Sequence, residues 1–135
     1  MNKVATTCLQ GGCHCGAVRY EVSTALPLDA VECNCSICTK SGYLYLLVNA
    51  KQFSLLQGSD DLNTYTFDTH EAKHYFCRHC GIKSFYVPRS NPQGFSINIH
   101  CLDDYPELEM TRRTFDGQHW EASFQKLYIK PGVKK

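Results

Sequence analysis

Short runs in which apolar and polar residues alternate recur along the chain, and they predict β-strands. Over 18–22, apolar residues alternate with charged ones, which is the pattern of a strand with one buried face. Residues 95–101 alternate in the same way and predict another half-buried strand. Further segments of strand length are rich in apolar or aromatic residues: 43–48, 53–56, 64–67, 84–87 and 124–129.

Turn-forming residues separate these runs, as in Gly11-Gly12 and Asp116-Gly117. Apolar residues at the helical spacing of i, i+3, i+4 and i+7 are not sustained over three turns anywhere. We therefore expect only single helical turns, after Cys35 and around Trp120. Many short strands with closely spaced turns predict a mainly β fold class.

Composition and charge narrow the classes of protein to which the chain can belong. Its 135 residues are 43% hydrophobic and 20% charged, which suits a single folded domain over 1–135. A formal net charge of +1 lacks the basic excess with which proteins bind nucleic acid or anionic membranes. The longest apolar run, 43–48, is too short to cross a bilayer, and the first residues lack the apolar core of a signal peptide. We therefore expect a cytoplasmic protein.

The chain has nine cysteines, and a cytoplasmic protein rarely pairs so many of them in disulfides. Clustered cysteines in such a protein more often bind metal. Seven of them form three groups, which are Cys13 and Cys15; Cys33, Cys35 and Cys38; and Cys77 and Cys80. Cysteines at i and i+3 converge in a turn, and those at i and i+2 lie on one side of an extended segment. Each group can therefore offer its sulfurs to one ion, and the spacing predicts zinc sites.

Counting the sulfurs favours one closed site and one open site. The two pairs together make a tetrahedral set, and we assign a structural zinc to Cys13, Cys15, Cys77 and Cys80. Its binding would contribute about 10 kcal/mol or more to folding. The remaining three cysteines would hold a second zinc with one open position, as reactive zinc sites do: Cys33, Cys35 and Cys38.

Other arrangements stay open at this stage, because one sequence does not fix which groups share an ion. A further ligand would close the second site and make it structural as well, and the chain offers His14, His70, His74, His79, His100 and Cys101. Cys101 falls on the apolar face of its expected strand, which favours a buried thiol. We expect Cys8 to be a free thiol without a role.

Three cysteine motifs carry a resemblance to a known family. They are Gly11-Gly12-Cys13-His14-Cys15-Gly16, Cys33-Asn34-Cys35-Ser36-Ile37-Cys38 and Phe76-Cys77-Arg78-His79-Cys80-Gly81. In this order they resemble the motifs of the glutathione-dependent formaldehyde-activating enzymes and of centromere protein V. The resemblance extends from about residue 9 to about residue 129.

This resemblance implies a β-tent, or Mss4-like, fold of antiparallel sheets stapled by zinc. It implies the same division into a structural zinc and an active-site zinc. It also implies condensation of formaldehyde with glutathione to S-hydroxymethylglutathione, the reaction of a carbon–sulfur lyase. Asn34 stands where the family often has His, Thr39 stands where bacterial members often have Arg, and 88–92 is closer to the centromere protein V branch.

Two functions from different classes follow from these observations. In the first, the chain is a zinc-dependent carbon–sulfur lyase with two zinc ions, acting on a small thiol and an aldehyde, with glutathione as candidate co-substrate. Three thiolates make the second zinc a soft centre, on which a substrate thiol ionises and attacks the aldehyde carbon. The candidate contacts for such a thiol are Lys40, Arg89 and His100. The alternative is a non-catalytic zinc module that binds a protein partner, as centromere protein V does, with a nuclear location.

Overall fold

The computed structural model describes residues 6–122, which contain ten strands, one short α-helix and five 3₁₀ turns. The strands are β1 (Thr6–Gly12), β2 (Arg19–Ala25), β3 (Leu28–Cys33), β4 (Leu44–Asn49), β5 (Phe53–Gln57), β6 (Leu62–Tyr65), β7 (Lys73–Cys77), β8 (Phe85–Val87), β9 (Gly94–Asn98) and β10 (Met110–Phe115). The helix is α1 (Ser36–Ser41), and the 3₁₀ turns are η1 (Ala50–Gln52), η2 (Ser59–Asp61), η3 (Ile99–Cys101), η4 (Tyr105–Glu107) and η5 (Gly117–His119). No helix within 6–122 is long and apolar enough to span a bilayer.

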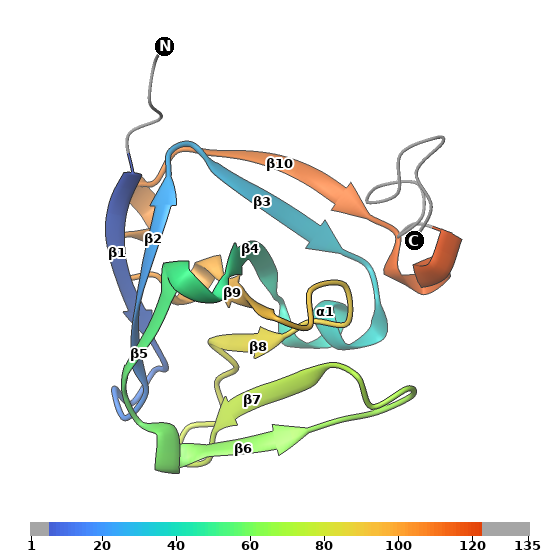
Figure 1. The fold of residues 1–135 in the computed structure, drawn as a ribbon, viewed down its shortest axis with the longest axis horizontal. Coiled ribbons are helices and arrows are strands. Elements are labelled where there is room, and N and C mark those ends of the chain that lie inside the picture. Colours follow the sequence, from blue (N-terminus) through green and yellow to red (C-terminus); the bar gives the residue numbers. More distant parts are fainter. Residues whose placement is uncertain (1–5, 123–135) are drawn as a thin grey trace.

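The strands form two sheets (Figure 1). The smaller sheet has the order β1-β2-β5, and the larger sheet has the order β10-β3-β4-β9-β8-β7-β6. Neighbouring strands are antiparallel, apart from β10 and β3, which are parallel. The mainly β class predicted from the sequence is therefore confirmed.

The larger of two buried hydrophobic clusters lies between the two sheets, and aromatic rings from both sheets contribute to it. The alternation along β2 buries Tyr20 and Val22 completely on the face turned towards the larger sheet. Tyr20 packs against Phe53 of β5, with ring centroids 5.5 Å apart, and against Phe85 of β8 at 6.1 Å. Because these rings leave water on folding, their burial holds the sheets together.

Most of the predicted strands are present, with small differences at their ends. The segments 18–22, 43–48, 53–56, 64–67 and 84–87 overlap β2, β4, β5, β6 and β8, and the predicted single helical turns are α1 and the segment that begins with η5. The prediction for 95–101 is wrong in its second half, and its first half is buried on both faces, with Ser96 and Asn98 inside. There β9 ends at Asn98, whose side chain accepts a hydrogen bond from the amide of His100 (3.2 Å) and so caps η3. The strand predicted at 124–129 lies outside the described residues.

Candidate metal centres

Four cysteine sulfurs from distant parts of the chain meet at one place. They come from the loop between β1 and β2, from the end of β7 and from the turn after it: Cys13, Cys15, Cys77 and Cys80. All four sulfurs lie within 4.8 Å of one another, and that of Cys15 lies 3.6 Å from those of Cys13 and Cys77. One ion could contact all four of them. Because β1 and β7 belong to different sheets, this four-cysteine group connects the sheets.

Backbone turns bring these sulfurs together. The amide of Cys13 donates to the carbonyl of Val18 (3.1 Å), and the amide of Gly81 donates to that of Cys77 (2.8 Å). Gly81 has a φ of 78°, in the left-handed region that glycine adopts without strain. The amides of Val18 and His79 point at the sulfurs of Cys13 and Cys77, at 3.3 and 3.4 Å. Such N–H donors stabilise thiolates, which are the form that binds metal.

Three further sulfurs gather where β3 meets α1, on the opposite side of the view in Figure 1 from the loop after β1. Cys33 ends β3, Cys35 is the N-cap of α1, and Cys38 is buried within α1. Their sulfurs lie within 4.8 Å of one another. The Cys35 sulfur accepts a hydrogen bond from the amide of Cys38 (3.4 Å), so the cap that begins the helix also fixes a sulfur of this three-cysteine group.

No fourth protein ligand joins the three-cysteine group within residues 6–122. The rest of the chain contains no His, Cys, Asp or Glu side chain. Of the residues that could have closed the site, His79 contacts Asp61 (2.7 Å) and His100 contacts the carbonyl of Gly42 (3.0 Å). Cys101 is half-buried in η3, where burial raises the pKa of its thiol to about 12. The described residues therefore offer three candidate ligands here, and four at the other group.

The thiols of the three-cysteine group differ in pKa. The thiols of Cys33 and Cys38 donate to the sulfur of Cys35 and hold the pKa of Cys35 far below its usual range. The same contacts raise the pKa of Cys38. The group therefore stabilises one thiolate, and a metal that binds must displace protons from its neighbours.

A segment distant in sequence braces the turn between Cys33 and Cys35. The Asn34 side chain donates to the carboxylate of Asp116 (3.0 Å) and accepts from the amide of Gln118 (3.1 Å). A β-carbon on Gly117 would lie 2.5 Å from the Cys33 sulfur, so the backbone packs directly on the cysteine. The sequence marked Asn34 only as a departure from its family, and nothing in its spacing revealed these contacts.

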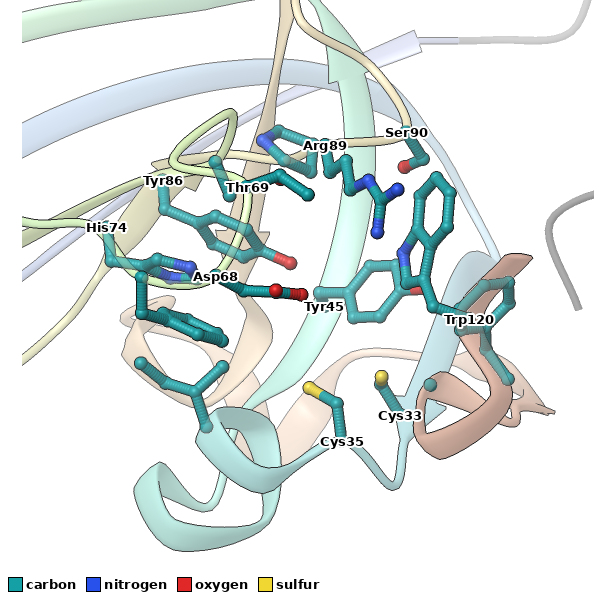
Figure 2. Close-up of a pocket in the computed structure, with 16 residues that line it drawn as sticks. Cys33, Cys35, Tyr45, Asp68, Thr69, His74, Tyr86, Arg89, Ser90 and Trp120 are labelled. Carbon is teal, nitrogen blue, oxygen red and sulfur yellow. The ribbon is translucent and has the colours of Figure 1, made fainter.

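A cavity of about 140 Å³ opens beside this site, and the sulfurs of Cys33 and Cys35 point into it (Figure 2). Its walls come from β4, β7, β8, β10, the loop after β6 and the helical turn at Trp120. Six of the side chains that line it carry aromatic rings: Tyr45, Phe67, His74, Tyr86, Phe115 and Trp120. A concave, largely apolar site with a few polar groups is the usual form of a small-molecule site.

Arg89 supplies the positive charge that lines this cavity. Its guanidinium stacks on the ring of Trp120 at 3.9 Å and forms ion pairs with Glu71 (3.5 Å) and Glu121 (3.3 Å). Both glutamates are mostly exposed, so these pairs are weakly held. Of the three substrate contacts predicted from the sequence, Arg89 is the one that the structure places in the cavity wall.

The other two predicted contacts lie outside this wall. Lys40 is exposed at the end of α1 and lines a shallow hollow next to the cavity, which shares Ile37 and Phe67 with it. His100 is exposed in η3 and contacts the backbone at Gly42. The structure therefore places Lys40 beside the cavity and His100 outside both hollows.

His74, which the sequence offered only as one of six residues that could close the second site, lines the cavity. It is almost completely buried, stacked on Tyr86 with ring centroids 4.6 Å apart and on Phe67 at 5.4 Å. Neither ring nitrogen has a hydrogen-bond partner among the described residues. Burial, followed by the charge of Lys83, lowers the pKa of His74 to about 4. The ring is therefore neutral at pH 7.

The chain is similar to known proteins both in sequence and in structure. The sequence matches the family described as "Glutathione-dependent formaldehyde-activating enzyme" over residues 8–118. A Halomonas elongata protein named "Putative glutathione-dependent formaldehyde-activating enzyme" is 32% identical in an alignment 80 residues long, and the match covers 53% of this chain and 51% of that protein. The match thus spans about half the length of that relative. The crystal structure of a Rhodobacter sphaeroides protein is similar with a TM-score of 0.64 and 35% identity, covering 76% of this chain and all of the other.

Proposed function

The chain belongs to the glutathione-dependent formaldehyde-activating family, and from this premise we propose that it is a zinc-dependent carbon–sulfur lyase acting on a thiol–aldehyde adduct. The observation that carries the proposal is a group of three cysteines that has no fourth ligand among residues 6–122 and lies beside a largely apolar cavity. The proposed substrates are a small thiol, with glutathione as the first candidate, and formaldehyde.

The donor sets fit zinc. Soft thiolates are the ligands that zinc takes in structural Cys₄ sites, and three protein ligands with an open position are typical of its catalytic sites. We assign a structural zinc to Cys13, Cys15, Cys77 and Cys80 and a second zinc to Cys33, Cys35 and Cys38. When bound at the second group, zinc would supply a soft Lewis acid that favours the ionised form of a thiol. The proposal includes a single β-tent, or Mss4-like, domain over 1–135.

The proposed reaction joins a thiol to formaldehyde. The sulfur lone pair forms a bond to the carbonyl carbon, the C=O π electrons move to oxygen, and the proton lost by the thiol ends on that oxygen. The product is an S-hydroxymethyl thioether, and the reverse reaction breaks the same carbon–sulfur bond. Atoms and electrons balance without an oxidant or a reductant.

The protein's residues hold and orient the reactants. With a substrate in the cavity, its aromatic walls would shield the sulfurs from water, which would strengthen electrostatic interactions inside. Arg89 at the wall and Lys40 in the adjoining hollow offer positive charge for the carboxylates of glutathione, and His100 is the more distant of the predicted contacts. A ligand that reaches from Cys35 to Lys40 would pass Ile37 and Phe67, which line both spaces.

Exchange spectroscopy tests this function. NMR magnetisation transfer between formaldehyde hydrate and S-hydroxymethylglutathione should be faster with the protein than in buffer alone. Cys38→Ser should return the exchange to the buffer rate, because it removes a ligand of the second zinc. Cys101→Ser, which removes a half-buried thiol outside both groups, serves as the control and should exchange like the wild type.

Two results would contradict the proposal. Equal exchange with the wild type and Cys38→Ser would show that the three-cysteine group is not the site. Two zinc ions per chain with exchange no faster than in buffer would instead support a non-catalytic zinc module that binds a protein partner.

A further inference from the structure

A buried cation lies beneath the wall of the cavity. Lys83 belongs to the segment between β7 and β8, and its side chain turns inward, so that only 9% of the residue is exposed. Its Nζ has no hydrogen-bond partner among the described residues and lies 4.1 Å from the ring centre of Tyr86 and 4.6 Å from that of Tyr43. Removing an ammonium group from water in this way is costly unless another charge compensates it.

The two tyrosines cannot supply that compensating charge. Burial raises the pKa of Tyr43 and of Tyr86 well above the usual range, so both phenols stay neutral. The Tyr43 hydroxyl donates to the carbonyl of Ser96 (2.7 Å), which occupies its proton. The ring faces attract Lys83 as cation–π partners, but they add no negative charge.

Acidic side chains do not compensate Lys83 either. Within residues 6–122 it forms no ion pair, and the two glutamates that pair with Arg89, Glu71 and Glu121, are mostly exposed. Asp68 lines the cavity without pairing with Lys83. Tyr43 and Tyr86, over whose rings Lys83 lies, share one buried cluster with Cys38, and Cys33 and Cys35 pack against that cluster. The three-cysteine group is therefore the source of negative charge in the same buried region. Burial lowers the pKa of Lys83 to about 8, and these sulfurs act against that shift.

We infer that Lys83 is a positioning residue, the internal counter-ion of the three-cysteine group, and that its charge favours a thiolate over a neutral ligand at the open position. Three thiolates and one Zn²⁺ carry a formal charge of −1, and a fourth thiolate would make it −2. A cation in the same low-dielectric region offsets that accumulation. The inference rests on the proposed function in so far as a divalent metal occupies the group.

Packing alone does not require a cation at this position. A methionine side chain has similar length and would fill the space against Tyr43 and Tyr86 without losing hydration. Packing therefore does not explain why this buried residue is charged, whereas attraction between its ammonium group and the thiolates does. A charge effect and a packing effect are separable by experiment, because only the first depends on the charge of the ligand.

The test compares Lys83→Met with the wild type and with Lys73→Met, which removes an exposed lysine at the start of β7. The proteins are loaded with Co²⁺, and absorption at the metal is followed during titration with 2-mercaptoethanol, an uncharged thiol, and separately with imidazole, a neutral ligand. Native mass spectrometry at increasing chelator concentration gives the affinity of each metal site.

Lys83→Met should bind 2-mercaptoethanol, and the metal at the three-cysteine group, about 10- to 100-fold more weakly than the wild type. Imidazole binding and the four-cysteine metal should be unchanged, and Lys73→Met should match the wild type.

Equal weakening of thiol and imidazole binding in Lys83→Met, or weakening of neither, would overturn the inference. A wild-type protein whose cobalt does not bind thiol would refute the proposed function, while the metal affinities would still test the counter-ion. Should Lys83→Met not fold, Lys83→Arg and Lys83→Gln replace it. Lys83→Arg should then keep the preference for 2-mercaptoethanol over imidazole, and Lys83→Gln should lose it. The same preference in both variants would refute the inference.

Discussion

Gly117 shows how a single residue can control the three-cysteine site. A β-carbon there would lie 2.5 Å from the Cys33 sulfur and 2.8 Å from the Cys35 β-carbon. We expect Gly117→Ala to push the sulfurs apart and weaken metal binding at this group about tenfold or more. The affinity of the four-cysteine group is the internal control, since Gly117 does not approach it. Chelator titration with native mass spectrometry measures both affinities, and unchanged binding at the three-cysteine group would contradict this prediction.

Arg19 and Asp103 give a pH-dependent contribution to stability. The guanidinium donates to both carboxylate oxygens, at 3.0 and 2.5 Å, and so lowers the pKa of Asp103. A lowered carboxyl pKa stabilises the fold above the unfolded value of about 3.9, and this contribution is lost as the pH falls through the folded value.

Because both side chains are partly exposed, Asp103→Asn should cost about 1 kcal/mol or less of unfolding free energy at pH 7. Urea unfolding at pH 7 and below pH 3 measures the difference between variant and wild type. It should shrink at the lower pH, and a constant difference would show that the pair does not act through its charge.

Single residues were predictable where their spacing carries chemistry. The cysteine groups follow from sequence intervals, because a turn brings i and i+3 together whatever the rest of the chain does. His74 and Lys83 carry no such signal, since their burial depends on contacts with Tyr86 and Tyr43 that only the assembled sheets create.

Strands were predictable where one face is buried and the other is polar. In β2 every second residue is buried, so its pattern is visible in the sequence. Between β10 and β3, Arg112 forms an ion pair with Glu32 (2.9 Å) and Arg113 forms one with Asp29 (3.1 Å), so both strands carry charged side chains on an exposed face. The pattern of β10 therefore resembles a polar loop, and both strands went unpredicted.

The contact between the β3–α1 turn and the segment after β10 gives a prediction about elements. Asn34→Ala would remove the side-chain hydrogen bonds to Asp116 and Gln118, and with them the brace on Cys33 and Cys35. We expect metal affinity at the three-cysteine group to fall about tenfold, as for other residues that orient metal ligands. Isothermal titration with Zn²⁺ in the presence of a competing chelator measures it. Asn63→Ala, at an exposed position in β6, is the matched control, and an effect of equal size there would contradict the role of Asn34.

At the scale of the whole molecule, the four-cysteine group connects the two sheets. Cys80→Ser should lower the free energy of unfolding by several kcal/mol, because zinc binding at such a site is part of the folding free energy. Thermal unfolding followed by circular dichroism tests this, with Cys8→Ser, which changes an exposed thiol, as the control. A Cys80→Ser protein as stable as the wild type would show that this group does not hold the sheets together.

The sequence predicted a mainly β molecule, but it did not predict how the strands divide between two sheets. That division depends on aromatic contacts between residues far apart in the chain, such as Tyr20 with Phe85. It also depends on the parallel pairing of β10 with β3, which joins strands from opposite ends of the described chain. Local patterns do not encode such pairings, because each strand could pair with many partners.

The central claim is that the three-cysteine group leaves a position for a thiol, and X-ray absorption at the cobalt edge tests it most directly. Because three ligands should bind metal more weakly than four, a chelator removes zinc from the three-cysteine group first. Co²⁺ then takes its place there, while zinc stays at the four-cysteine group. The account predicts about three sulfur neighbours around cobalt, rising to about four when a thiol is added. Four protein ligands before the thiol is added, with no change afterwards, would contradict it.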